Sequence, residues 1–475
     1  MAMQWDLTET ALALRRGEIT AETLLDQHLQ TIELRQPQLN CFVTLDEAGA
    51  RAQARASAAR HHGGAPLSML DGIPVALKDN IDIAGLPTSN GTAELRPTSE
   101  DAAVTARLRA AGAVLLGKLN MHECALGATT DNPHHGQTHN PWRAGYTPGG
   151  SSGGSGAAVA AGLVLASLGT DTLGSVRLPA AYCGIVGLKA TMGLISTRGV
   201  VPLSDSLDHI GPICRSVRDT SLMVALLSGE DSGQAGAVAA PPGWSPEPQA
   251  GDSLQGLRIG ILDQAWTADL TEDVAAGFTQ AEQVLQDLGA NLVPLSLPDL
   301  TPGTLQRPAL LVIEAEGADA LADPLRQTPD AFSDGIKSML AYGHDAPAER
   351  LEQAQRLLTE AGLAVRQALE QVDLIASPTA PQTAFAFTDP APVNQANLTM
   401  LANISGCPAI TLPCGVAPSG LPLALQLMAR PFDEAELLGA AQILEKTWGR
   451  LFPPDQPERP YMALRSRNAA ICSSE

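Results

Sequence analysis

The order of apolar and polar positions predicts strands that alternate with helices. Short apolar runs at 73–78, 114–118 and 257–263 predict buried strands. Residues 101–112 and 272–289 have the mixed apolar and polar pattern of helices that lie against a sheet. Because alternating strands and helices build a sheet with helices packed on it, the pattern predicts an α/β fold.

The two ends of the chain extend this pattern. The Ala- and Leu-rich N-terminal part predicts two packing helices within 7–60, with Thr8 and Thr20 as N-caps. Residues 229–254, dense in Gly, Pro and Ser, predict a surface excursion. The remaining expected elements are a strand at 291–297, a long helical stretch at 304–371, strands at 374–381, 408–415 and 423–429, and a helix at 433–448.

Composition and charge narrow the classes of protein. The 475 residues carry 51 acidic and 30 basic side chains, a net charge of −21. Such an acidic chain argues against a nucleic-acid partner and against an anionic membrane surface, because both need a basic face. Aromatic residues make up 3%, too few for platforms on which bases stack. A mean hydropathy of +0.03 is typical of a globular protein.

The cysteine pattern bears on compartment. There are seven cysteines, an odd number, and no two of them form a CxxC pair. This excludes a disulfide framework and a zinc module as the organising principle. We find no basic-then-apolar leader and no apolar run of the ~18 residues that a membrane span needs. The sequence therefore predicts a cytoplasmic protein without a membrane segment.

The Gly- and Ser-rich segment 147–156 is the first candidate for chemistry. A phosphate loop fails because no Lys lies between 118 and 189, and a GxGxxG motif fails because residue 159 is Val. Residues 149–153 match GxSxG, but no apolar strand precedes them, as a nucleophile elbow requires. A plain linker is disfavoured, because a strongly apolar run follows the segment.

A serine hydrolase with a lysine base is the fourth interpretation. Lys78 ends an apolar strand, and burial lowers the pKa of a lysine so that its neutral form can act as a base. Ser151 lies in the Gly/Ser loop and Ser175 lies in the run GTDTLGSVRLPA. One hydroxyl can relay a proton from the other to the lysine. Spacing alone leaves this interpretation open beside the others.

Long stretches of the chain resemble the amidase signature family. The stretches are GIPVALKDNIDIAG at 72–85, GGSSGGSGAAVAAG at 149–162, GTDTLGSVRLPAAYCGIVGLKAT at 169–191, SLDHIGPICRSVRD at 206–219, NISGCPAITLPCG at 403–415 and LALQLMARPFDEAELL at 423–438. They cover most of the chain in the family's order, and only about 220–400 is weakly matched. The resemblance implies a single α/β/α sandwich domain over 1–475, with a large twisted mixed sheet under helices on both faces. Its signature core would span about 65–220, and a variable helical substrate region would span about 300–400.

The resemblance also implies roles for residues. Lys78 would be the general base, Ser151 the bridging serine with a cis peptide bond, and Ser175 the nucleophile. The oxyanion hole would consist of the backbone amides of Thr172, Leu173, Gly174 and Ser175. Many family members have glycine where this chain has Leu173. Leucine fits if its φ is negative, and its side chain then narrows the pocket.

Other residues near these motifs have structural interpretations. We expect Asp171 and Arg177 to form an ion pair beneath the loop, Ser152 to make hydrogen bonds within it, and Ser155 to cap a helix at 157. The histidines at 122, 134, 135 and 139 are spaced by Pro133 and Gly136 and are assigned to a pocket rim or the surface. We expect no metal and no cofactor.

Two functions remain open. The first is a free-standing amidase that acts on a small or medium carboxamide. The second is the amidase subunit of a tRNA-dependent amidotransferase, which the family also contains. Residues 129–142, TTDNPHHGQTHNPW, differ from the pattern expected of the second. The expected partner is a small-molecule amide, and a homodimer is open because family members are often dimers.

Overall fold

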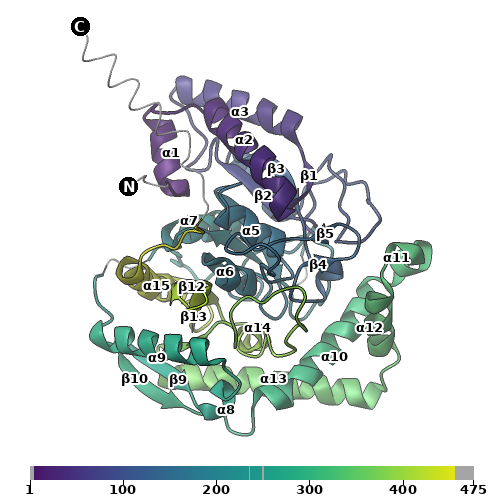
Figure 1. Ribbon diagram of the computed structural model, residues 1–475, viewed down its shortest axis with the longest axis vertical. Coiled ribbons are helices and arrows are strands. Elements are labelled where there is room, and N and C mark those ends of the chain that lie inside the picture. The colour runs from purple at the N-terminus through teal and green to yellow at the C-terminus, as the bar shows by residue number, and fades with distance from the viewer. Residues whose placement is uncertain (1–4, 235, 249–250, 455–475) are drawn as a thin grey trace.

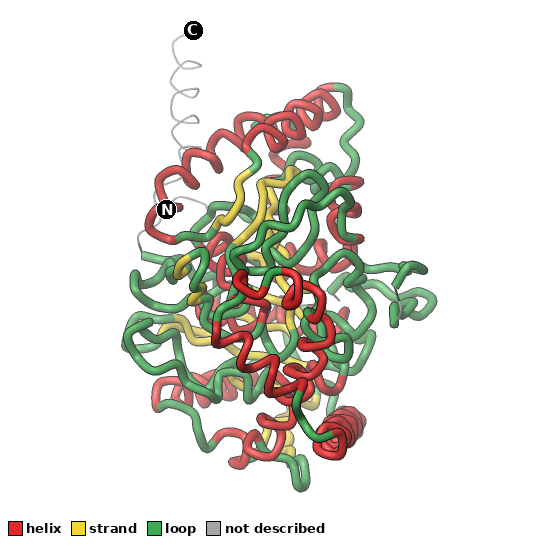
Figure 2. The backbone as a smooth tube through the Cα atoms, turned by 90° about the vertical axis from the view of Figure 1, so that its right-hand side faces the viewer, coloured by secondary structure: helices red, strands yellow, loops and turns green. Residues whose placement is uncertain are grey.

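One sheet runs through the computed structural model, which describes residues 5–234, 236–248 and 251–454. The sheet has 11 strands, and their order in space is β1-β3-β2-β6-β8-β7-β12-β13-β11-β9-β10. Figure 2 shows the strands running through the middle of the molecule with helices outside them. In the same order the strands are β1 (Phe42–Leu45), β3 (Val114–Leu119), β2 (Pro74–Lys78), β6 (Ala166–Asp171), β8 (His209–Cys214), β7 (Val186–Lys189), β12 (Ala409–Val416), β13 (Pro422–Met428), β11 (Leu374–Pro378), β9 (Arg258–Leu262) and β10 (Asn291–Leu295).

Strand directions make the sheet mixed. β2 is parallel to both β3 and β6, and β9 is parallel to both β10 and β11. The strands between these two groups pair antiparallel. A separate pair of short strands, β4 (Asp131–Asn132) and β5 (Gly136–Gln137), lies outside the large sheet. The α/β prediction is confirmed.

Helices cover both faces of this sheet (Figure 1). Around the centre, α5 packs on α6, and α7 packs on α15. The helices of the first half are α1 (Leu7–Arg15), α2 (Ala21–Leu39), α3 (Glu47–His62), α4 (Ala103–Ala110), α5 (Gly153–Ala160), α6 (Arg177–Cys183) and α7 (Val217–Leu227). Those of the second half are α8 (Gln264–Thr267), α9 (Glu272–Asp287), α10 (Pro302–Ala320), α11 (Ala322–Gln327), α12 (Asp334–His344), α13 (Ala348–Gln371), α14 (Met400–Ser405) and α15 (Glu434–Trp448). Two short 3-10 helices are η1 (Glu123–Ala125) and η2 (Pro329–Ala331).

The N-terminal part differs from the prediction of two helices. Instead of two helices within 7–60, three helices and the short edge strand β1 occupy residues 7–62. Thr20 caps α2 as expected, but α1 is capped by Asp6. Thr8 lies inside α1, where its hydroxyl donates to Asp219. Asp6 is the N-cap because its carboxylate accepts from the Glu9 amide while the Glu9 carboxylate accepts from the Asp6 amide, a capping box that begins two residues before Thr8.

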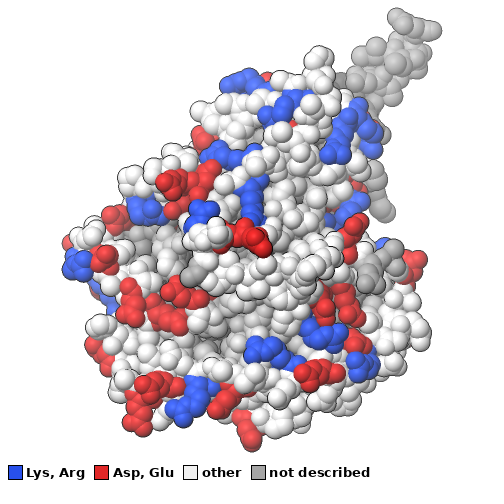
Figure 3. Space-filling model, turned by 180° about the vertical axis from the view of Figure 1, so that it is seen from behind, with Lys and Arg blue, Asp and Glu red and all other residues white. Residues whose placement is uncertain are grey.

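The excursion at 229–254 has neither helix nor strand in its described part. It is anchored at Trp244, whose indole N–H donates to Glu434 at 3.0 Å. No helix among the described residues is long and apolar enough to cross a membrane. On the face shown in Figure 3, acidic and basic side chains are interspersed.

Candidate active site

Lys78 lies at the carboxyl end of β2 with no exposed surface. Its Nζ donates to Ser151 Oγ at 2.6 Å and to Thr170 Oγ1 at 2.7 Å. β2 and β6 are parallel with Leu77 opposite Leu168, so their carboxyl ends bring Lys78 beside Thr170 at one edge of the sheet. The register of the sheet therefore places the Lys78 amine next to the Gly/Ser loop.

Burial sets the charge of this lysine. Loss of water lowers the pKa of Lys78 from 10.5 to about 7. The negative charges of Asp208 and Asp171 act in the opposite direction and raise the pKa of Lys78, but by less than burial lowers it. A large share of Lys78 is therefore neutral near pH 7, and a neutral amine can accept a proton.

The Gly/Ser loop is packed tightly around Ser151. The peptide bond between Gly150 and Ser151 is cis, as the family resemblance implies. A Cβ atom on Gly150 would lie 2.6 Å from the Thr129 nitrogen, so only glycine fits there. The Ser151 carbonyl accepts from the backbone N–H of His122 at 2.9 Å. Ser151 is thus held between a neighbouring loop and the amine of Lys78.

Two other serines of this loop support it from below. The Ser152 hydroxyl donates to the carbonyl of Thr170 at 3.1 Å and accepts from the amide of the same residue at 3.3 Å. Ser155 does not cap a helix at 157, because α5 already begins at Gly153. Its hydroxyl instead donates to the Leu168 carbonyl at 3.1 Å. Backbone carbonyls at the buried end of β6 thus accept from both serines, and the local sequence around the serines does not reveal these acceptors.

Ser175 is the last residue of the tight turn 172–175, which leads from β6 toward α6. Within the described chain, none of the four amides of this turn donates to a protein acceptor. Gly174 has φ +136°, a conformation that favours glycine. Leu173 is not among the residues with positive φ, so leucine is compatible with its backbone. The turn therefore presents backbone donors beside the Ser175 hydroxyl.

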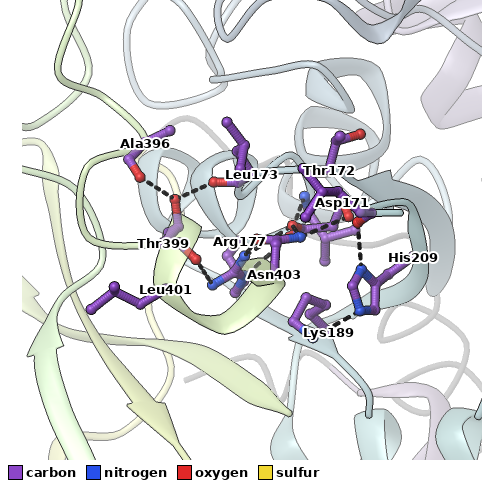
Figure 4. Close-up of polar contacts among 12 residues, drawn as sticks. Asp171, Thr172, Leu173, Arg177, Lys189, His209, Ala396, Thr399, Leu401 and Asn403 are labelled. Carbon is purple, nitrogen blue, oxygen red and sulfur yellow. Dashed lines mark hydrogen bonds and ion pairs between the residues drawn. The ribbon is translucent and has the colours of Figure 1, made fainter. Parts of the chain in front are cut away.

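A buried ion pair lies beneath this turn, as expected. The Arg177 guanidinium binds the Asp171 carboxylate through Nε at 3.0 Å and Nη2 at 2.9 Å. Both side chains are fully buried, and the arginine holds the pKa of Asp171 well below its usual range although burial alone would raise it. Arg177 also donates to Gln426 and Asn403 at 2.7 and 2.6 Å. Figure 4 shows this network between α6 and α14.

A cavity of about 530 Å³ opens at Ser175. Its wall is mostly apolar, and it includes side chains from the turn, from α10 and α12, and from the loop before α14. The apolar lining residues include Leu126, Leu173, Leu178, Leu203, Leu310, Ile313, Met339, Pro392 and Val393. Leu173 is thus part of the wall of this cavity.

Charge in this wall is sparse. Among its described residues, Arg307 is the one with a permanent charge, and it is bound to the Glu314 carboxylate through both terminal nitrogens. The guanidinium also lies 4.6 Å from the ring centroid of Tyr342. His122 lines the cavity too, and burial lowers the pKa of His122 to about 4, so its ring is neutral near pH 7. The cavity thus offers no unpaired charge within its described wall.

Each histidine of the loop 129–142 makes a polar contact with a neighbouring group. His134 Nε2 lies 3.0 Å from Glu123, and His135 Nε2 lies 2.9 Å from the Thr92 carbonyl. The His139 ring accepts from the Gly145 amide at 3.2 Å. Among the described residues, no three His, Cys, Asp or Glu side chains come close enough together to hold a metal ion.

The structure adds site residues that sequence reasoning missed. Asp208 accepts from the Thr172 hydroxyl at 2.6 Å and from two backbone amides, and burial raises its pKa. Thr170 shares the Lys78 amine with Ser151. Thr399, the N-cap of α14, donates to the Leu173 carbonyl in the turn, and Asn403 of α14 donates to the Asp171 carbonyl just before it. Asn403 opens one of the matched stretches, but no pattern near Thr399 pointed to the turn.

Known proteins are similar to this chain along most of its length. The family model described as Amidase matches residues 23–438. A glutamyl-tRNA(Gln) amidotransferase subunit from Roseiflexus sp. (strain RS-1) is 40% identical over 468 residues, which is 92% of this chain and 94% of that protein. A solved amidase is 32% identical with a TM-score of 0.85, over 94% of this chain and all of its own. The peptide amidase of Stenotrophomonas maltophilia is 29% identical with a TM-score of 0.85, over 96% of this chain and 99% of its own. The extent of these matches and the shared fold show that this chain belongs to the amidase signature family.

Proposed function

We propose that this protein is an amidase that hydrolyses a carboxamide C–N bond through an acyl-enzyme on Ser175. The observation that carries the proposal is the 2.6 Å contact between Lys78 Nζ and Ser151 Oγ. Ser175, the proposed nucleophile, lines the cavity. A buried lysine with a pKa of about 7 in contact with a hydroxyl is a base ready to receive a relayed proton.

The reaction takes place in two halves. Neutral Lys78 accepts the proton of Ser151 as Ser151 accepts that of Ser175, and Ser175 Oγ attacks the amide carbon. The oxyanion is bound by the amides of the turn 172–175, each worth ~2.7–4 kcal/mol in comparable sites. The C–N bond then breaks as the relayed proton reaches the leaving amine. Water attacks the acyl-enzyme by the same relay, which releases the carboxylic acid and restores the Ser175 hydroxyl.

The wall of the cavity favours an uncharged, apolar acyl group. Apolar surface that leaves water on binding stabilises the complex by about 25 cal/mol per Å². A substrate with free charges would have to find partners in a wall whose one permanent cation, within its described part, is already bound to Glu314. Simple aliphatic or aromatic carboxamides fit this wall.

A second candidate is the amidase subunit of a tRNA-dependent amidotransferase. The observation that favours it is the 40% identity with a protein named as part of a glutamyl-tRNA(Gln) amidotransferase. Such a subunit would work with partner subunits and would take its amide from a charged donor such as glutamine. The paired state of Arg307 is the feature of the cavity that weighs against such a donor.

Two measurements on the purified chain test the proposal. A fluorophosphonate probe should add once to the wild type, at Ser175, and should not add to Ser175→Ala when both are analysed by intact mass and peptide mapping. Release of ammonia from hexanamide and benzamide should then exceed release from glutamine. A folded wild type that neither takes up the probe nor cleaves any amide contradicts the proposal. Labelling with turnover of glutamine alone would favour the second candidate.

A further inference from the structure

We propose that Thr399 is a positioning residue that aims the Gly174 amide at the oxyanion of the reaction. This inference rests on the proposed amidase function. Thr399 is the N-cap residue of α14, outside the motifs that carry the family resemblance, and its side chain is fully buried. It therefore acts on the reaction through the backbone of the turn 172–175.

The contacts of Thr399 face the turn on two sides. Its hydroxyl donates to the Leu173 carbonyl at 2.5 Å, and its own carbonyl accepts from Arg177 Nη1 at 2.8 Å. Figure 4 shows the side chain of Thr399 directed at Leu173 and its carbonyl directed at Arg177. The hydroxyl has one proton, and the other acceptor within reach, the Ala396 carbonyl, is farther at 3.2 Å. The hydroxyl proton is therefore donated to the Leu173 carbonyl, which is the closer of the two acceptors.

Because a peptide bond is planar, the bond from Thr399 to the Leu173 carbonyl also fixes the direction of the Gly174 N–H. The Leu173 carbonyl and the Gly174 amide belong to one planar peptide unit, in which C=O and N–H of a trans bond point in opposite directions. A hydroxyl that draws the carbonyl toward α14 holds the N–H on the opposite side, away from α14. The Gly174 N–H has no protein acceptor among the described residues, so it is free to bind a ligand oxygen.

This peptide unit needs such a restraint more than its neighbours do. Glycine at 174 has φ +136° and can turn more freely than other residues. The flanking parts of the turn have their own polar restraints, from Thr172 to Asp208 and from the Val176 amide to Asp171. Within the described chain, Thr399 is the one side chain hydrogen-bonded to the Leu173–Gly174 peptide. A Cβ on Gly174 would also clash with Thr399 Oγ1, so the glycine leaves the room in which this hydroxyl sits.

The test compares three substitutions at this position. Thr399→Val keeps the shape and removes the hydroxyl, Thr399→Ser keeps the hydroxyl, and Thr399→Cys keeps only a weak donor. Loss of one oxyanion donor lowers kcat by about 10²–10³-fold in comparable enzymes, and a donor that is merely misdirected should lose less. We expect Thr399→Val to lower kcat on hexanamide about 10–100-fold with KM within twofold. Thr399→Ser should stay within about threefold of wild type, and Thr399→Cys should lie between the two.

A tetrahedral mimic reports on the same donor independently of turnover. The ketone 1,1,1-trifluoroheptan-2-one adds to an active-site serine and places an oxyanion where the hexanamide oxygen would be. Its inhibition constant should rise with Thr399→Val in proportion to the fall in kcat. The matched control is Thr359→Val, which removes an exposed threonine hydroxyl bonded to the Gln355 carbonyl at 2.9 Å on α13 and should change neither quantity.

The outcomes separate this inference from the proposed function. An unchanged kcat and inhibition constant in folded Thr399→Val, or equal losses in Thr399→Val and Thr399→Ser with a lowered Tm, would overturn the positioning role while the amidase stands. A wild type that takes up no fluorophosphonate and cleaves no amide would remove both. Loss of kcat with rescue by serine and a matched loss of ketone affinity supports the inference.

Discussion

The signature core at 65–220 and the helical region at 300–400 contribute differently to the site. The core supplies buried polar groups in fixed hydrogen bonds, such as Lys78 and Ser151. The helical region supplies mainly apolar wall, such as Leu310 and Met339. A proton relay needs fixed geometry, whereas an apolar wall needs only shape and area. Changes in the first region should therefore alter rate, and changes in the second should alter substrate preference.

The two regions meet under the turn 172–175. Arg177 of the core is bonded to Thr399, at the end of the helical region, and to Asn403, just after it. Reaction rate and substrate preference thus depend on different contacts, and these contacts do not belong to two separate domains. The following predictions test that division, from the largest expected effect to the smallest.

The largest effect is expected from the nucleophile. Ser175→Ala should lower kcat on hexanamide by about 10⁴-fold or more, because loss of a catalytic serine costs on that scale in enzymes of this kind. Steady-state ammonia release, with the Tm of both proteins as the folding control, is the measurement. Residual activity within tenfold of wild type would show that the reaction does not go through Ser175.

The buried ion pair should dominate stability in the core. Arg177→Met leaves Asp171 charged and without its partner in the interior, which should lower the free energy of unfolding by about 3–5 kcal/mol. Urea denaturation at neutral pH measures this. The control is Arg326→Met, whose pair with Asp323 is exposed and should contribute ~0–1 kcal/mol. Equal losses in the two variants would contradict the role given to Arg177.

The pH dependence should follow Lys78. Its neutral form is the base, so kcat/KM should rise with pH through a midpoint at about 7 and should fall about tenfold per pH unit well below it. Asp208 raises the pKa of Lys78, so Asp208→Asn should move the midpoint to lower pH. Rate profiles of both proteins from pH 5 to 9 measure the shift. A midpoint that stays in place or moves upward would assign the titration to another group.

The smallest effect is expected in the apolar wall. Leu310→Ala removes apolar contact from the cavity, and KM for hexanamide should rise about tenfold while the rate on propionamide stays the same. The matched control is Leu363→Ala, which removes a leucine that is 47% exposed on α13. A parallel loss on both amides would show that Leu310 affects the reacting groups and not substrate preference.

The amino-acid sequence alone determined the elements that depend on local pattern. The apolar run before Lys78 became β2, and the long helical stretch became α10 to α13. It was wrong where a group on another element decided the contact, as when the Leu168 carbonyl of β6 accepts from the Ser155 hydroxyl that was expected to cap a helix at 157. The roles of Lys78, Ser151 and Ser175 came from the resemblance of motifs, since spacing left several interpretations open.

Only the tertiary structure decided which groups meet. Lys78 reaches Ser151 because β2 and β6 pair in parallel with a particular register, and register is a property of the sheet. Other features of the site also depend on segments that meet only in the folded chain. These are the free amides of the turn, the pairing of Arg307 in the cavity wall and the contact of Thr399 with Leu173. Local sequence sets periodicity and φ preferences over a few residues. Burial and contacts between residues 226 apart in sequence, as for Leu173 and Thr399, form only when the chain folds.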